Sequence, residues 1–423
     1  MNEKSEQIDA GLNYHVDYDE PLDWRGSIFA AVGKALPQSQ FEVRRCKLSD
    51  GMHRVGYYVA SNGIRHFLLL SAVTFLGGAG CHPIFKKRIQ MKRWYKGFYN
   101  SLNETPDACV HFMGVYHYRG NILFVDFDAQ SYVGNKMHNS SAFVYTNDLY
   151  RAMKDGIAFR RDFNGHGITT IARTRLLEFL ENGGHSCDND YNSLIEVFMN
   201  FNSTFPFRQW IAGISAIKEM CEGGDRNWRQ TEWAGWFLEY KFYSYLDSEH
   251  ITTIEFCRNK KHDENLDFDL WFPIQKFYGD LKASDVSEPA APGNAQTSML
   301  AAINKYDRLW YVVFEHATIK DSAVEDKFCD ARKTFLLCKD GAIKNREHKS
   351  SRHRVLKNQV CFNRMFIFEL NRMNYQSLLT SFNQGRQSTG HSRKPKFNLQ
   401  KKRLSELENY QILHYEPDDD RSH

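Results

Sequence analysis

The sequence lacks several patterns that would assign a function directly. It contains no CxxC pair, no GxxxxGK[ST] loop and no GxSxG turn. Finger-type zinc sites, ATP-driven chemistry and a serine nucleophile elbow are therefore not indicated. No His/Asn/His array with useful spacing is present either. The candidate chemistry has to come from carboxylates and basic side chains.

Long apolar runs and a strong net charge are also missing. The longest apolar run, residues 66–80, is too short to span a bilayer, so we expect no membrane segment. The 55 basic and 51 acidic residues leave a net charge of only +4, so a nucleic-acid surface would have to come from local basic patches. Nine irregularly spaced cysteines and a polar N-terminus without a signal-peptide pattern predict a reduced, cytoplasmic compartment.

The length of 423 residues, 42% of them hydrophobic, predicts two or three domains with sizeable cores. Changes in composition divide the chain as follows: a flexible N-terminus at 1–20, an α+β region at 21–225, a core at 226–375, and a basic C-terminal segment with an acidic tail at 376–423. Within the core, periodicity predicts the order helix, strand, strand, strand, helix, strand. The Pro/Gly-rich stretch 287–295 predicts a loop.

Two strand-like segments of this core carry the clearest chemical proposal. Asp269 lies in DFDLWF, and Asp280 and Lys282 lie in FYGDLKAS. The short separation lets one strand turn and return, which would bring the two carboxylates together. Side chains alternate along a strand, so Lys282 should share a face with Asp280. Two carboxylates can hold a divalent cation, and a nearby ammonium group can stabilise charge on a phosphate.

These residues and the order of elements resemble the PD-(D/E)xK nuclease superfamily, which includes most type II restriction endonucleases. Asp269 matches the first aspartate of that motif, and Asp280-Leu281-Lys282 matches its tripeptide. Two N-terminal stretches, 82–100 and 140–156, are similar to segments of restriction endonucleases. The sequence departs from the motif in having Phe268 in place of the proline, and Asp where Glu is commoner.

The resemblance implies a mixed-sheet α/β nuclease core and a Mg²⁺ cofactor. Asp269, Asp280 and the Leu281 carbonyl would bind the metal, and Lys282 would contact the attacking water. Glu239, in the preceding helix, would be the accessory acidic residue, although Asp267 is an alternative. Gln296 stands where some members place a polar residue that faces the site. The implied partner is double-stranded DNA, and cutting both strands makes a homodimer the default.

A basic and aromatic stretch at 82–100 is the candidate DNA-binding segment. Basic side chains neutralise phosphates and supply non-specific affinity. The alternative is a surface helix whose aromatic side is buried. Two further basic stretches, 344–354 and 385–397, suit phosphate contacts or are plain loops. The candidate DNA-binding residues are Lys86, Lys87, Arg88, Lys92, Arg93 and Lys96.

Close Cys/His pairs occur at Cys81-His82, Cys109-x-His111 and His185-x-Cys187. They follow no finger spacing, so buried reduced cysteines with incidental histidines are the favoured interpretation. Asp126 and Asp128 point to one face of a strand, where an acidic edge or a DNA-facing polar patch is favoured over a second metal site.

The sequence therefore predicts a Mg²⁺-dependent, sequence-specific endonuclease of the type II restriction class. Two other classes stay open. One is a non-catalytic DNA- or RNA-binding protein, in which the Asp/Lys stretch is structural. The other is a repair or transposition nuclease with the same core.

Overall fold

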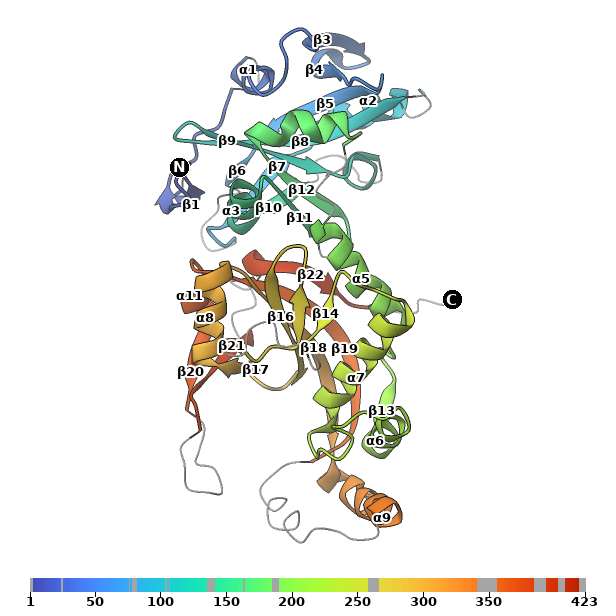
Figure 1. Cartoon of the computed structure of the whole chain (residues 1–423). Coiled ribbons are helices and arrows are strands. Elements are labelled where there is room, and N and C mark those ends of the chain that lie inside the picture. Colours follow the sequence, from blue (N-terminus) through green and yellow to red (C-terminus); the bar gives the residue numbers. More distant parts are fainter. Residues whose placement is uncertain are drawn as a thin grey trace. The chain divides into compact units, whose positions relative to one another are not determined.

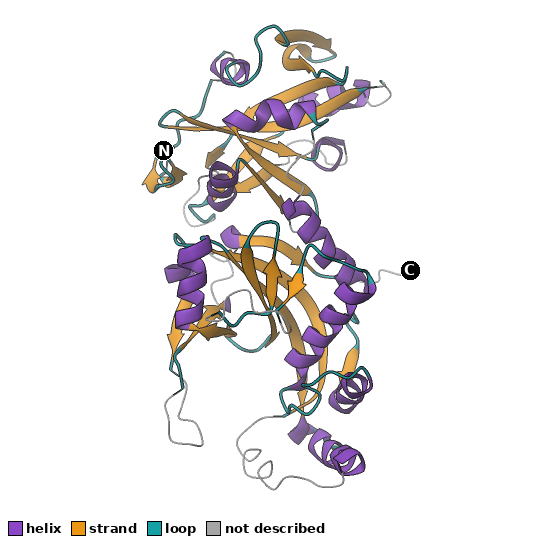
Figure 2. Ribbon diagram, in the orientation of Figure 1, coloured by secondary structure: helices purple, strands orange, loops and turns teal. Residues whose placement is uncertain are grey.

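The structure is a computed structural model that describes residues 3–417, apart from 24–25, 76, 78–81, 103–104, 106, 135–140, 163, 185–189, 258–265, 341–355, 384–392 and 402–407. The fold is mixed α/β, as predicted (Figure 2). The chain divides into two compact units, Met1–Asn192 and Ser193–His423. No helix among the described residues is long and apolar enough to cross a membrane.

Unit 1 is built on a seven-stranded sheet in the order β11-β12-β9-β8-β5-β4-β3. Its strands are β3 (Phe41–Leu48), β4 (Gly51–Val59), β5 (Arg65–Ala72), β8 (Ala108–Tyr118), β9 (Asn121–Phe127), β11 (Ile157–Arg161) and β12 (Gly167–Ala172). β5 and β8 are parallel, and the other neighbours are antiparallel. β8 and β9 form a hairpin, whose two turn residues, Arg119 and Gly120, have positive φ.

Smaller elements cover this sheet. Two short sheets are formed by β1 (Ser5–Ile8) with β2 (Tyr14–Asp17), and by β6 (Thr74–Phe75), β7 (Lys86–Gln90) and β10 (Ser141–Tyr145). The helices are α1 (Ser27–Gly33), α2 (Arg93–Leu102), α3 (Thr146–Asp155) and α4 (Leu176–Glu181). Successive residues of β5 enter different cores, Leu69 on one face and Leu68 and Leu70 on the other, so the sheet is buried on both sides.

Unit 2 is built on a second seven-stranded sheet, in the order β13-β19-β18-β16-β15-β14, with β22 paired to β19. Its strands are β13 (Trp210–Ala212), β14 (Glu255–Phe256), β15 (Leu270–Phe272), β16 (Phe277–Asp285), β18 (Leu309–Lys320), β19 (Lys357–Leu370) and β22 (Gln411–Tyr415). β14, β15 and β16 form an antiparallel meander, whereas β16 and β18 are parallel.

The helices of this part of the chain are α5 (Asp190–Thr204), α6 (Gly213–Glu222), α7 (Trp233–Ser248), α8 (Gln296–Tyr306), α9 (Phe328–Asp340) and α11 (Tyr375–Leu378). α7 and α8 lie on opposite sides of the sheet (Figure 1). A helix therefore precedes the three-stranded meander, and α8 precedes the parallel strand β18. This is the order of helices and strands that the sequence predicts.

The prediction of a loop at 287–295 is wrong. Residues Ala290–Ala295 form β17, which pairs with β21 (Lys396–Gln400) in a three-stranded sheet with β20 (Leu379–Phe382). Proline is tolerated because β17 is an edge strand whose register shifts after Pro292. A Cβ at Gly293 would lie 1.7 Å from the Phe397 carbonyl oxygen, so the pairing requires glycine there.

Candidate functional site

The predicted carboxylates meet at the point where β15 begins. Asp269 comes directly before β15, and Asp280 lies in β16, whose Gly279 pairs with Leu270. Extending that antiparallel register by one residue places Asp269 opposite Asp280. The Asp269 side chain also fixes the strand, because its Oδ2 accepts a 3.0 Å hydrogen bond from the backbone N–H of Leu281.

Lys282 lies beside both carboxylates. Its Nζ is 2.6 Å from Oδ2 of Asp280 and 3.9 Å from Oδ2 of Asp269. Asp280 is 1% exposed, and its Oδ1 accepts no hydrogen bond from any described residue. Asp269 is more open, with a side chain that is 22% exposed. The cluster therefore has a buried inner carboxylate and a partly accessible outer one.

The charges in this cluster perturb one another. Burial and the Asp280 carboxylate raise the pKa of Asp269 well above its usual value, although Lys282 opposes the change. Burial alone would lower the pKa of Lys282, but Asp280 and Asp269 raise it above its usual value. The two carboxylates repel each other, and one ammonium group only partly offsets that repulsion.

Glu239 is the acidic neighbour that the structure favours. It lies half-buried on α7, and its charge contributes to the raised pKa of Asp269. Asp267 is exposed, precedes the strand, and is not among the groups that perturb Asp269. Gln296 does not face the site, because its amide donates to Ser381 Oγ and to the Lys396 carbonyl oxygen.

Tyr311 is a polar neighbour that the sequence analysis missed. It lies in β18 directly opposite Asp280, and parallel pairing puts the two side chains on one face. Its side chain is fully buried, and burial together with the Asp280 charge raises its pKa well above the usual value. The strand-like run LWYVVF was the available sequence signal for Tyr311. An aromatic residue in an apolar strand, however, is more often part of the hydrophobic core.

The basic stretch of unit 1 separates into different environments. Lys87 is fully buried, and its Nζ lies 3.1 Å from Asp19 Oδ1 and 2.9 Å from Ser5 Oγ. An ammonium group held this way cannot reach a phosphate, so Lys87 is removed from the predicted DNA-binding set. Lys86 lies over the Phe143 and Tyr145 rings, and Lys96 is half-buried on α2.

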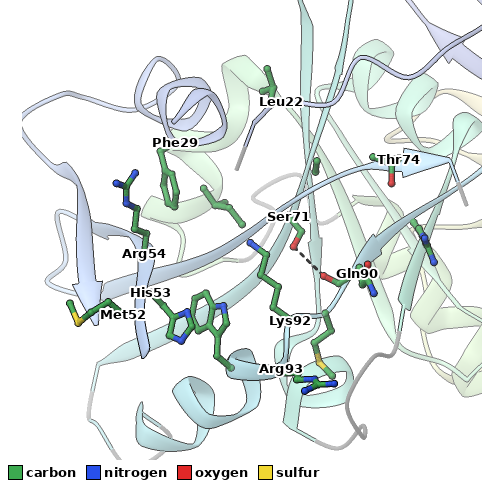
Figure 3. A pocket seen from close by; sticks show the side chains of 15 residues that line it. Leu22, Phe29, Met52, His53, Arg54, Ser71, Thr74, Gln90, Lys92 and Arg93 are labelled. Carbon is green, nitrogen blue, oxygen red and sulfur yellow. Dashed lines mark hydrogen bonds between the residues drawn. The ribbon is translucent and has the colours of Figure 1, made fainter. Parts of the chain in front are cut away.

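The other three predicted DNA-binding residues line a cavity of about 860 Å³. Arg88 lies on β7, Lys92 directly precedes α2, and Arg93 is the first residue of α2. Arg54 adds a fourth cation, and Figure 3 shows Arg54, Lys92 and Arg93 around the cavity. Burial lowers the pKa of Lys92.

Aromatic rings form part of the same cavity wall. Trp94 stacks on His53 with ring centroids 4.5 Å apart and an interplanar angle of 17°. The aromatic side of α2 is also buried, since Tyr95 and Phe98 enter the core. The same short helix therefore packs against the sheet and presents Arg93 to the cavity. The basic stretches 344–354 and 385–392 lie outside the described residues, residues 393–395 lead into β21, and residues 396–397 are its first two residues.

One comparison with known proteins bears on this part of the chain. Residues 64–180 match the family model described as Methylase-associated X1, or MTaX1. The match runs from β5 to α4, so it covers the central strands of the large sheet in unit 1. It links the chain to restriction–modification systems, in which this domain is found. The match does not extend to Asp269, Asp280 or Lys282. No curated protein and no solved structure matches the chain.

Proposed function

We propose that this chain is a Mg²⁺-dependent endonuclease that cuts double-stranded DNA at a fixed sequence, within a restriction–modification system. The observation that carries the proposal is the cluster of Asp269, Asp280 and Lys282 beside β15 and β16. Two repelling carboxylates that share a single ammonium group are costly to hold together. A divalent cation would offset this repulsion.

The donor atoms fit magnesium. Mg²⁺ prefers oxygen ligands, usually one or two carboxylates with waters and phosphate oxygens. Asp269 and Asp280 supply the carboxylates. The Leu281 N–H points toward Asp269, and in a strand the carbonyl of a residue points the same way as its N–H, so the Leu281 carbonyl is a third candidate ligand. When bound, such a cation would polarise a phosphate and acidify a bound water.

Lys282 would act through its positive charge. Its raised pKa keeps the side chain protonated at neutral pH, so it can donate hydrogen bonds but cannot accept a proton. A fixed ammonium group stabilises the negative charge that develops on a phosphate during hydrolysis, and it can orient the attacking water. Glu239 would add negative charge near Asp269, which favours cation binding.

Double-stranded DNA is the proposed substrate on two grounds. The MTaX1 match links the chain to restriction–modification, in which DNA is the target. Unit 1 also offers four cations around one cavity, with a stacked Trp94–His53 pair in the wall. Cations bind the phosphates of a duplex. Cutting both strands needs two sites, so a homodimer on a symmetric sequence stays part of the proposal.

The test is incubation of the purified chain with unmethylated phage DNA and Mg²⁺. Asp280→Ala and Lys282→Ala variants are run beside it, with Asp267→Ala as a matched control that removes an exposed carboxylate close by. We expect discrete bands from the wild type and from Asp267→Ala, and intact DNA from the other two. Gel shifts then check that the inactive variants still bind DNA.

Other results identify the alternatives. Intact DNA in every lane, with gel shifts that persist in EDTA, would assign the chain to the DNA-binding proteins. Cleavage that prefers branched or damaged DNA over a fixed sequence would indicate a repair or transposition nuclease. Cleavage that survives both Asp280→Ala and Lys282→Ala would move the active site away from this cluster.

A further inference from the structure

A second cluster of ligand atoms lies in unit 1, on one face of its large sheet. β5 and β8 are parallel, with His66 opposite Cys109 and Leu68 opposite His111. Because side chains alternate, this register puts His66, Cys109 and His111 on the same face. One ring nitrogen of each histidine and the cysteine sulfur all lie within 4.8 Å of one another. All three residues fall in the MTaX1 segment.

The two histidine rings turn nitrogen atoms toward each other. Nδ1 of His66 lies 2.9 Å from Nε2 of His111. Nδ1 of His111 lies 3.0 Å from Asp126 Oδ2, and a carboxylate can only accept, so this nitrogen carries a proton. In a neutral ring the Nε2 of His111 then has its lone pair free, directed at His66. Metal-bound histidines commonly have this arrangement, with a carboxylate on the far nitrogen.

The His111 ring is held from several sides. Asp126 bonds one nitrogen, and the Phe179 ring lies edge-on with its centroid 5.9 Å away. Gly184 packs so closely that a Cβ there would lie 2.6 Å from His111 Cε1. A ring fixed in this way is positioned before any ligand arrives, which reduces the cost of binding.

We propose that His66 Nδ1, Cys109 Sγ and His111 Nε2 bind a zinc ion, with water in the fourth position and Asp126 as a positioning residue. Two imidazoles and one thiolate are a ligand set that suits Zn²⁺ far better than Mg²⁺ or Ca²⁺. His66 and His111 are buried, whereas Cys109 is only partly buried, so the site has an entry path. Asp126 bonds His111 through Oδ2, and its Oδ1 has no hydrogen-bond partner among the described residues.

Of the two aspartates grouped on sequence, Asp126 contacts the cluster through Nδ1 of His111. Asp128, which was grouped with Asp126 on sequence, is bonded instead to Gln130 N–H and Ser131 Oγ.

The first measurement is the metal content of the full-length chain, purified without a histidine tag and dialysed without chelator. Elemental analysis should find about one zinc per wild-type chain. Cys109→Ser and His111→Ala should lose it. Cys46→Ser is the matched control, because Cys46 is another partly buried cysteine of unit 1. Asp280→Asn should keep its zinc, which separates this site from the proposed Mg²⁺ site.

The second measurement distinguishes a variant that lacks a metal ligand from a variant that is misfolded. Cobalt(II) added to metal-free wild type should give the absorption band of a cobalt–thiolate bond, and Cys109→Ser should not. Asp126→Asn keeps the shape of the carboxylate but weakens its hold on His111, so zinc affinity should fall by about 10–100-fold with the fold unchanged by circular dichroism. A folded wild type that binds neither zinc nor cobalt would overturn the proposal and leave a proton-sharing histidine pair.

Discussion

Lys282 and Asp280 form an ion pair of 2.6 Å from the same face of one strand. The pair is two residues apart, which is the closest spacing at which strand side chains share a face. Asp269 reaches the same pair from the residue directly before β15, at 3.9 Å from the Lys282 ammonium. One cation is thus shared between two carboxylates. This imbalance makes the cluster a functional candidate and also gives it a measurable cost in stability.

Replacing Asp269 with Asn should stabilise the metal-free protein while it abolishes cutting. The substitution removes a charge that Asp280 repels, and the amide oxygen can still accept the hydrogen bond from Leu281 N–H. We expect a gain of about 1 kcal/mol, which is about 2–4 °C in the melting temperature of a unit of this size. The measurement is thermal unfolding in EDTA.

Adding Mg²⁺ completes that experiment. A ligand that binds only the folded state raises the melting temperature, so the wild type should gain stability and Asp269→Asn should not. Asp267→Asn is the control, because Asp267 is exposed and takes no part in the cluster. A melting temperature that falls in Asp269→Asn, or that rises equally with Mg²⁺ in both proteins, would contradict the assignment of Asp269 as a metal ligand.

Lys87 should matter for folding and not for DNA contact. Lys87→Met keeps most of the buried stem but leaves Asp19 without its cation, and breaking a buried pair from one side costs about 3 kcal/mol. Lys86→Met is the control, since Lys86 lies over aromatic rings and should cost less than about 1 kcal/mol. The measurement is denaturant unfolding. Equal losses of unfolding free energy in both variants would show that the buried Lys87–Asp19 pair contributes no more to stability than Lys86 does.

Local patterns predicted the part of the site that local geometry determines. Strand alternation was enough to pair Asp280 with Lys282, and the short connection to Asp269 was enough to bring the second carboxylate back. The order of helices and strands around them followed from hydrophobic periodicity. These relations depend on residues close together in the chain, so a sequence pattern contains them.

Long-range pairings were beyond the sequence. The run KKR at 86–88 has the pattern of an exposed basic patch, yet Asp19, 68 residues away from Lys87, holds that lysine in the interior. β17 has the composition of a loop and is a strand only because β21 pairs with it. Cys109-x-His111 has no finger spacing, and the third candidate ligand atom comes from His66 on a neighbouring strand. No local pattern indicates these partners.

Arg93 should contribute to DNA affinity without sequence preference. It is exposed at the edge of the unit 1 cavity, where it can bind a phosphate. Arg93→Ala should weaken binding to every duplex and reduce the slope of log affinity against log salt by about 1. Fluorescence anisotropy over a range of salt concentrations measures this slope. Lys320→Ala, an exposed lysine of unit 2, is the control, and an unchanged slope in Arg93→Ala would place DNA elsewhere.

Asp285, at the end of β16, should make the free energy of unfolding depend on pH in the acid range. Burial opposes ionisation of Asp285, but hydrogen bonds from Thr318 and Ser287 outweigh it and lower its pKa to about 2. A pKa of the folded state below the unfolded value of 3.8 adds stability above pH 4, which is lost as the pH falls through 2. After allowance for solvent screening, we expect about 1 kcal/mol at neutral pH, with about half lost by pH 3.

Asp285→Asn should be less stable than the wild type at pH 7, and the difference should shrink toward pH 3 in denaturant unfolding. A difference that stays constant between pH 7 and pH 3 would mean that the hydrogen bonds to Asp285 do not depend on its charge.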